Sequence, residues 1–405
     1  MRLPAGTYPR TVGSVRVIVA RVTIYPQFIN RLVDTYLGLY FQPMNTTTEN
    51  NTPMKRIAML LMLFSFLTMS LAARAVPETE HQADHMYGSF AAKEEIPFHS
   101  DVRTGRLDNG FQYFILENDY PADRATLRLF VDAGSVQESD DQRGLAHYVE
   151  HMAFNGTERY GETELVGFLE SLGIQFGPDV NAYTSYDETV YKLEVPTDDE
   201  EAFGQSLRVM EQWAHAIRFD PDAVERERGV IVEEWRSGRG ASQRMSEKHL
   251  PVLFGDSLYA ERRPIGTIER IRSATATDLR EFYDRWYRPD NMVFIAVGDF
   301  EIDDVEDRIR TLFGPIQRPD TPLNRPTYHV ETQTERQVSI ASDPEASYSS
   351  VSFYSREEPY RFETVADYAA MLVRSVYSSI ANERLRELSR QEGSPLLRAG
   401  IGWTR

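Results

Sequence analysis

Residues 144–154, Gly-Leu-Ala-His-Tyr-Val-Glu-His-Met-Ala-Phe, constrain this chain more than any other segment. The segment is apolar apart from two histidines and one glutamate, and the Asn-Gly pair that follows is typical of a helix end. In a helix of 3.6 residues per turn, His147 and His151 lie one turn apart on one face, with Glu150 beside them. The segment therefore predicts a helix that presents two imidazoles and a carboxylate together.

Two imidazoles at this spacing are typical of a zinc site. Neutral histidine nitrogens hold Zn²⁺ at about 2.0–2.1 Å, and bound zinc lowers the pKa of its water to about 7. We therefore predict one zinc ion held by His147 and His151, with Glu150 as the base that activates the zinc-bound water. The order His-x-x-Glu-His is the inverzincin signature. The alternative is a pair of ordinary hydrogen-bonded histidines that flank a glutamate by chance.

A second group of carboxylates follows Pro221, a residue typical of helix starts. Glu227 and Glu234 are seven residues apart, so they lie on one face of the predicted helix. A catalytic zinc takes three protein ligands, so one more must come from outside residues 144–154. We predict Glu234 as that ligand and Glu227 as a catalytic-site carboxylate that supports a ligand or faces the substrate. The alternative is a solvated helix face paired with neighbouring arginines.

The combination of His147-x-x-Glu150-His151 with Glu227 and Glu234 resembles the pitrilysin and insulysin family of zinc peptidases, also called insulinase-like. In that family a glutamate seven residues after another supplies the third zinc ligand. The resemblance therefore implies the same ligand set and one zinc ion per catalytic domain.

Residues 176–189, Phe-Gly-Pro-Asp-Val-Asn-Ala-Tyr-Thr-Ser-Tyr-Asp-Glu-Thr, are closer still to the long periplasmic members of the PqqL type. The resemblance covers about residues 97–405, the N-terminal part of such a protein. The interval from His151 to Glu234 is longer than in shorter members of the family. Glu233 is therefore a second candidate for the third ligand.

The periodicity of residues 96–315 predicts one α+β domain, which the resemblance identifies as the catalytic peptidase domain: an antiparallel-rich sheet with helices on one face. Predicted strands cover residues 106–107, 111–116, 126–131, 181–186, 190–195 and 292–297. Predicted helices cover residues 163–172, 199–217, 221–250, 277–286 and 302–313.

The four prolines between positions 315 and 326 predict a linker at residues 316–328. Residues 329–405 then read as the incomplete start of a second, similar domain, with strands at 337–340 and 351–354, a helix at 365–388 and a closing strand. The family's long members have four such domains in two halves. The resemblance thus implies a second half, in the same full-length chain or a separate subunit, that completes the active site.

The N-terminal residues read as processing signals. Residues 54–75 have the basic start, apolar run and small-residue end of a signal peptide, and the run is shorter than the ~20 residues of a membrane-spanning helix. We therefore expect secretion across the inner membrane to the periplasm, with no stable membrane anchor. Residues 1–53 read as a non-native upstream extension outside the fold, and residues 76–95 as a flexible lead-in.

The predicted strand that contains Asn181, Ala182, Tyr183 and Thr184 is a candidate substrate-binding edge, because an extended peptide can pair with such a strand through main-chain hydrogen bonds. The alternative is an ordinary strand whose polar side chains face solvent.

The composition narrows the possible partners. A formal net charge of −18 argues against nucleic acid and anionic membranes, and the absence of cysteine excludes thiolate metal sites and cysteine nucleophiles. We therefore predict a zinc-dependent endopeptidase that hydrolyses peptides or small extended protein segments. The alternatives are a non-catalytic binding or structural half of an insulinase-like assembly, and an inactive truncated fragment. Non-catalytic relatives typically lose the zinc motif, which this chain keeps.

Overall fold

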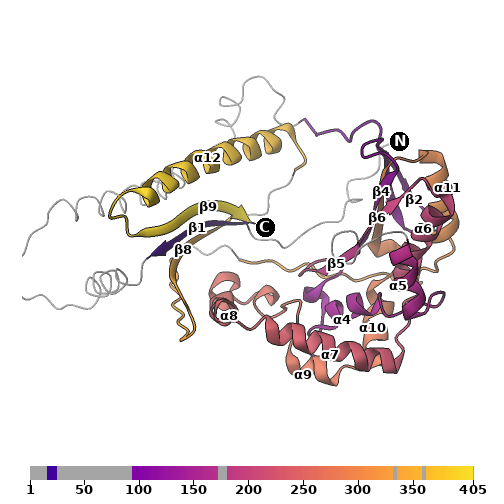
Figure 1. Cartoon of the computed structure of the whole chain (residues 1–405), viewed down its shortest axis with the longest axis horizontal. Coiled ribbons are helices and arrows are strands. Elements are labelled where there is room, and N and C mark those ends of the chain that lie inside the picture. The colour runs from indigo at the N-terminus through magenta and orange to yellow at the C-terminus, as the bar shows by residue number, and fades with distance from the viewer. Residues whose placement is uncertain (1–15, 25–93, 172–179, 332–334, 358–361, 405) are drawn as a thin grey trace, which may run out of the picture. The chain divides into compact units, whose positions relative to one another are not determined.

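The computed structural model describes residues 16–24, 94–171, 180–331, 335–357 and 362–404 (Figure 1). The predicted signal peptide lies outside the described residues, as do most of the predicted extension and lead-in. The chain divides into two compact units, which we describe separately. The described part of unit 1 lies within Phe98–Ala346, and unit 2 comprises the described residues of Arg16–Pro97 and Ser347–Arg405. The predicted domain boundaries stay predictions.

Unit 1 is built on a six-stranded sheet in the order β2-β3-β7-β4-β6-β5. Its strands are β2 (Arg103–Arg106), β3 (Gln112–Glu117), β4 (Arg124–Val131), β5 (Val180–Thr184), β6 (Thr189–Pro196) and β7 (Met292–Gly298). Neighbours are antiparallel except for the parallel pair β3–β7, which confirms the antiparallel-rich sheet. The predicted Asn-Gly turn joins β2 to β3, and Gly110 has the positive φ of 98° that such a turn requires.

The alternation of side chains along the strands gives the sheet one buried face. Leu127 and Leu129 of β4 are fully buried, and the strand register places Tyr191 and Leu193 of β6 opposite them. Arg128, between the two leucines, is exposed. Helices α6 and α11 contact this sheet through β4, β6 and β3, so the predicted helix layer is confirmed.

The helices of unit 1 are α4 (Leu145–Met152), α5 (Glu162–Ser171), α6 (Glu200–His215), α7 (Pro221–Ser237), α8 (Ala241–Phe254), α9 (Ile268–Ser273), α10 (Ala276–Trp286) and α11 (Ile302–Phe313). Short 3-10 turns cover η1 (Ser135–Gln137), η2 (Leu258–Ala260) and η3 (Pro289–Asn291). The prediction of a single helix at residues 221–250 is wrong, because α7 ends before Gly238 and α8 begins after Gly240. Helix α9 had no predicted counterpart.

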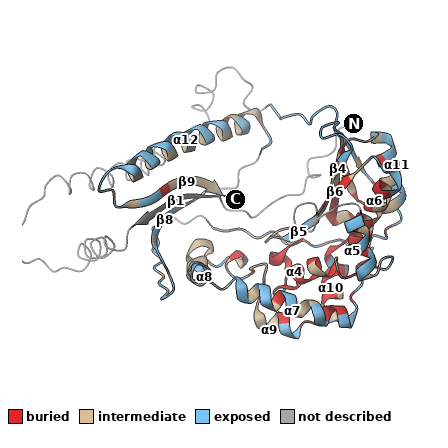
Figure 2. Ribbon diagram, viewed as in Figure 1, coloured by how far each residue is buried: buried red, intermediate tan, exposed pale blue. Residues whose placement is uncertain are grey.

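Helix α4 lies in the core of unit 1, where Figure 2 shows buried residues on α4, α6 and α10. It contacts α10, α7 and β5. The indole Nε1 of Trp213, on α6, donates to the carbonyl oxygen of Ala153 at 2.9 Å, and the hydroxyl of Tyr148 donates to the carbonyl oxygen of Val224 on α7. These bonds fix the middle and the C-terminal end of α4 relative to α7 and α6.

Residues 316–346 follow α11 and belong to unit 1. Arg325 forms an ion pair of 2.8 Å with Asp132 at the end of β4, and Arg244 of α8 binds Asp343 through two bonds of 2.7 and 2.6 Å. The strand predicted at residues 337–340 is wrong: this segment has no regular structure, and its apolar side chains are exposed.

Unit 2 contains a three-stranded antiparallel sheet in the order β8-β1-β9, made of β1 (Arg16–Ile24), β8 (Ser349–Glu357) and β9 (Leu396–Thr404). Helix α12 (Val365–Arg390) packs on β9, where Asn382 bonds both backbone groups of Ile401 at 2.9 and 2.8 Å. Our expectation that residues 1–53 lie outside the fold is wrong for residues 16–24, which form the central strand. None of the described helices is long and apolar enough to span a membrane.

Candidate metal centre

Helix α4 carries three of the predicted site residues. It begins after Gly144, whose φ of 101° lies in the left-handed region that favours glycine. Leu145, Val149 and Met152 are buried, as the apolar pattern predicts. The opposite side of the helix therefore presents its two histidines toward α7.

Helix α7 brings the second carboxylate cluster to α4. It begins at Pro221, and the side chain of Asp220 caps it by accepting the backbone N–H of Asp222 at 2.9 Å. Glu234 faces the two histidines. Glu233, the other candidate ligand, is 68% exposed in its side chain and pairs with Arg236. Of the two glutamates, the structure brings Glu234 to the histidines.

The three candidate ligands form a compact triangle of donor atoms. The Nε2 atoms of His147 and His151 lie 3.3 Å apart, and Oε2 of Glu234 lies 3.6 and 3.5 Å from them. Donor atoms on a tetrahedral zinc with bonds of about 2.0–2.1 Å are separated by about 3.4 Å. Two imidazoles and one carboxylate with this spacing fit a zinc ion. Within the described residues, this is the one group of three or more potential metal-binding side chains.

Glu227 fixes the orientation of one imidazole. Its Oε1 lies 2.7 Å from Nδ1 of His151, which leaves Nε2 facing Glu234. The side-chain amide of Asn155 donates to Oε2 of Glu227 at 3.0 Å and to the carbonyl oxygen of His151 at 3.1 Å. Burial raises the pKa of Glu227, but the hydrogen bonds from His151 and Asn155 outweigh it and lower the pKa overall. The pair is therefore charge-assisted, and Asn155 supports it without having been predicted.

The two imidazoles differ in charge. Burial, together with the nearby His151, lowers the pKa of His147 to about 4, so this ring is neutral near pH 7. Burial also lowers the pKa of His151, but Glu227 and Glu234 outweigh it and raise this pKa to about 9. A metal ligand must be a neutral imidazole, so a metal ion bound here at neutral pH would displace a proton from His151.

Glu150 lies beside the ligand triangle and outside it. The residue is only 7% exposed, and its Oε2 accepts a hydrogen bond of 2.7 Å from the hydroxyl of Thr184 on β5. Burial raises the pKa of Glu150, and the bond from Thr184 opposes that shift. A carboxylate held in this way can take up and release a proton near the metal.

The predicted substrate strand is β5, the edge of the sheet, which pairs only with β6 among the described strands. Asn181 accepts the backbone N–H of Ala182 at 2.9 Å, and the exposed Tyr183 donates to Glu188 at 2.9 Å. The hydroxyl of Thr184 is bonded to Glu150, a contact that the sequence did not predict. The binding of a peptide by this strand stays a prediction.

Comparisons with known proteins place this chain in a family. Residues 113–252 match the family Insulinase (Peptidase family M16), and residues 273–392 match the Peptidase M16 inactive domain. The zinc protease PQQL-like of Arabidopsis thaliana is 40% identical over 75% of this chain and 32% of its own length. The probable zinc protease PqqL of Escherichia coli is 35% identical over 72% of this chain and 31% of its own length.

A solved structure agrees with these matches. The crystal structure of the first half of the periplasmic protease PqqL from Escherichia coli has a TM-score of 0.65 and 34% sequence identity, over 73% of this chain and 63% of that one. This chain spans about a third of the length of the curated relatives named above. The chain belongs to the insulinase family of peptidases, family M16, and is similar to its PqqL-type members.

Proposed function

We propose that this chain carries the metal site and the base of a zinc-dependent endopeptidase that hydrolyses peptides or small extended protein segments. The observation that supports this most is the donor triangle of His147, His151 and Glu234, with Glu150 held beside it. The names of the relatives, zinc proteases from a plant and a bacterium, support the same chemistry.

Each residue has a distinct role in this proposal. Bound zinc would polarise the scissile carbonyl and acidify a water molecule. Glu150 takes the proton of the attacking water and later gives it to the leaving amine. Thr184 holds Glu150 in line for that transfer, and Glu227 holds His151. The open edge of β5 offers main-chain hydrogen bonds to an extended peptide.

The proposal extends to location and partners. We propose a periplasmic location, because the Escherichia coli protein with the matching half is a periplasmic protease. We also propose that fast turnover needs a second insulinase-like half, in the same full-length chain or a separate subunit. The share of the relatives that this chain spans, about a third, supports that requirement.

The second candidate function is that of a non-catalytic binding or structural half of an insulinase-like assembly. A related possibility is a truncated fragment without activity. The match of residues 273–392 to a domain described as inactive favours such a role for that part of the chain. The three candidate ligands on α4 and α7 favour a catalytic role for the part of the chain that precedes residue 273.

Cleavage of a quenched fluorescent peptide tests the proposal. Wild type and Glu150→Gln are compared with and without a chelator, each alone and with a second insulinase-like half supplied as a separate chain. We expect chelator-sensitive cleavage that needs the second half, and a loss of about 10²–10⁴-fold in Glu150→Gln, because the amide cannot act as a base. Glu233→Gln serves as the control and should keep full activity.

Two outcomes would contradict parts of this proposal. Unchanged turnover in Glu150→Gln would show that Glu150 is not the base. Turnover of roughly 1–10³ per second by the isolated chain would show that no second half is required.

A further inference from the structure

We propose that Glu138 is a positioning residue of the metal centre: its buried carboxylate holds the first turn of α4, and through it His147, in register with β5. This inference rests on the proposed metal function of His147, His151 and Glu234. It concerns how the ligands are held and adds no new ligand.

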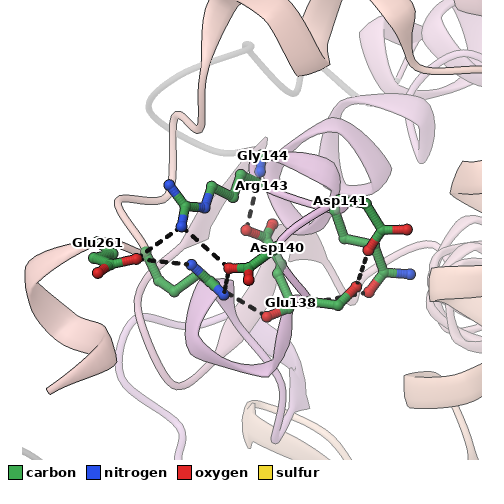
Figure 3. Close-up of polar contacts among 9 residues, drawn as sticks. Glu138, Asp140, Asp141, Arg143, Gly144 and Glu261 are labelled. Atoms are coloured by element: carbon green, nitrogen blue, oxygen red, sulfur yellow. Dashed lines mark hydrogen bonds and ion pairs between the residues drawn. The ribbon is translucent and has the colours of Figure 1, made fainter.

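The carboxylate of Glu138 takes the place of a helix cap. The residue is 3% exposed, and its Oε2 accepts the backbone N–H of Gly144 at 2.9 Å (Figure 3). Its Oε1 accepts the backbone N–H of Ala146 at 2.8 Å. Gly144, the cap position itself, has no side chain that could accept these bonds. The first N–H groups of a helix have no partner within it, and leaving them unpaired in a buried place costs stability. Glu138 thus fixes the backbone at the start of α4.

The start of α4 matters because His147 depends on it. Helix α4 has only eight residues, and His147 follows directly after Ala146 in its first turn. Nδ1 of His147 is buried and has no hydrogen-bond partner among the described residues, whereas the ring of His151 is held by Glu227. No hydrogen bond at Nδ1 therefore orients this ring, and the direction of its Nε2 depends on backbone position, on packing and on the contacts of Nε2 with His151 and Glu234.

Glu138 also connects this helix to the strand that holds the base. It follows η1, which forms two backbone hydrogen bonds of 3.1 and 2.9 Å with the turn between β5 and β6. Nε of Arg262 donates to the carbonyl oxygen of Glu138 at 3.0 Å. Thr184, which binds Glu150, ends β5 just before that turn. The segment made of η1 and Glu138 therefore links the turn after Thr184 to the helix that carries Glu150.

The surrounding ion pairs offer a matched control. Arg143 pairs with Asp140 at 3.1 Å and with Glu261 at 2.7 Å, close to Glu138 (Figure 3). The side chain of Glu261 is 57% exposed, and it forms ion pairs with Arg143 and Arg262. Glu261→Gln removes a carboxylate from the same neighbourhood without touching the first turn of the helix.

The experiment compares wild type, Glu138→Gln, Glu138→Ala and Glu261→Gln. Zinc affinity is measured by competition with a chromophoric chelator, and ligand geometry by the visible absorption spectrum of the Co²⁺-substituted protein. The amide in Glu138→Gln keeps one acceptor oxygen, so this variant serves if Glu138→Ala does not fold. We expect about 10-fold weaker zinc binding and an altered Co²⁺ spectrum in Glu138→Gln, and wild-type values in Glu261→Gln.

The readouts separate positioning from general stability. If Glu138→Gln only lowers the melting temperature, and keeps wild-type zinc affinity and Co²⁺ spectrum when folded, the inference is overturned. If wild type itself binds no zinc, the proposed function fails and this inference fails with it. Equal losses of zinc affinity in Glu138→Gln and Glu261→Gln would also overturn the inference. They would show that the negative charge near α4, and not the bonds of Glu138 to the helix backbone, affects zinc binding.

Discussion

At the scale of single residues, the metal centre joins side chains that hold one another in place. Glu227 orients His151, Asn155 holds Glu227, and Thr184 holds Glu150. Each of these contacts joins residues from different elements. Their removal should therefore change the geometry of the site more than the stability of the unit.

The ligand role of Glu234 is tested by comparing it with its neighbour. Glu234→Gln replaces the carboxylate that faces the Nε2 atoms of both imidazoles, so we expect zinc content, measured by elemental analysis after dialysis, to fall far below one ion per chain. Glu233→Gln changes an exposed carboxylate and should keep full zinc content. The reverse result would move the third ligand to Glu233.

Thr184 should affect the rate and leave zinc binding unchanged. Thr184→Val keeps the shape and removes the hydroxyl that donates to Glu150, whereas Thr184→Ser keeps the hydroxyl. A hydrogen bond to a charged group contributes about 1.5–3 kcal/mol, so we expect kcat to fall about 10–100-fold in Thr184→Val with little change in KM. Steady-state kinetics in the peptide assay check this. Equal kcat values for both variants would show that the hydroxyl of Thr184 does not support Glu150 in catalysis.

At the scale of elements, the position of α4 depends on a close backbone contact. A Cβ atom on Gly266 would lie 2.4 Å from the Cα of Gly144 and 2.5 Å from the carbonyl oxygen of Arg143. Gly266→Ala should therefore displace the start of α4 and lower the free energy of unfolding by about 1–3 kcal/mol.

A helix glycine with free space around it is the control. A Cβ on Gly229, in α7, meets nothing within 4 Å, so Gly229→Ala should stabilise the protein by about 0.5–1 kcal/mol. Urea denaturation measures both variants. An unchanged free energy of unfolding in Gly266→Ala would show that the loop around Gly266 and the start of α4 can move apart without loss of stability.

The end of β4 should give the protein a pH-dependent stability. Burial raises the pKa of Asp132 to about 6, although Arg325 opposes the shift, and the ordinary value is 3.8. Between those values the folded protein keeps a proton that the unfolded chain has lost. The free energy of unfolding therefore falls as the pH rises from about 4 to 6, by at most about 3 kcal/mol from this residue.

The variant Asp132→Asn tests whether Asp132 causes this change in stability between pH 4 and 6. Urea denaturation of both proteins at pH 4, 5, 6 and 7 should show a smaller decrease for the variant between pH 4 and 6. Above pH 6 the two curves should run parallel. Parallel curves over the whole range would mean that Asp132 titrates alike in the folded and unfolded states.

Local patterns predicted most of unit 1. The Asn-Gly hairpin, the alternation of β4 and the apolar face of α4 depend on neighbouring residues, and the structure has all three. The break between α7 and α8 was missed because a glycine inside a helical pattern is often tolerated. The failure at residues 337–340 has a related cause, since a short apolar run without a pairing strand stays exposed.

The contacts that support the site could not be read from the sequence. Thr184 and Glu150 are 34 positions apart, and Asn155 and Glu227 are 72 apart, so no local period connects them. The buried Glu138 gave no signal, because an acidic residue before a helix normally suggests a solvated loop. Only the packing of η1, β5 and α7 around α4 brings these groups together.

At the scale of the whole molecule, we propose that two helices of unit 1 bring His147, His151 and Glu234 together to bind one zinc ion. The decisive measurement is an anomalous difference map recorded at the zinc absorption edge, from crystals of the full chain grown with zinc. We expect one peak about 2.0–2.1 Å from both Nε2 atoms and from the carboxylate of Glu234. A map with no peak there, or with its main peak at other side chains, would contradict it.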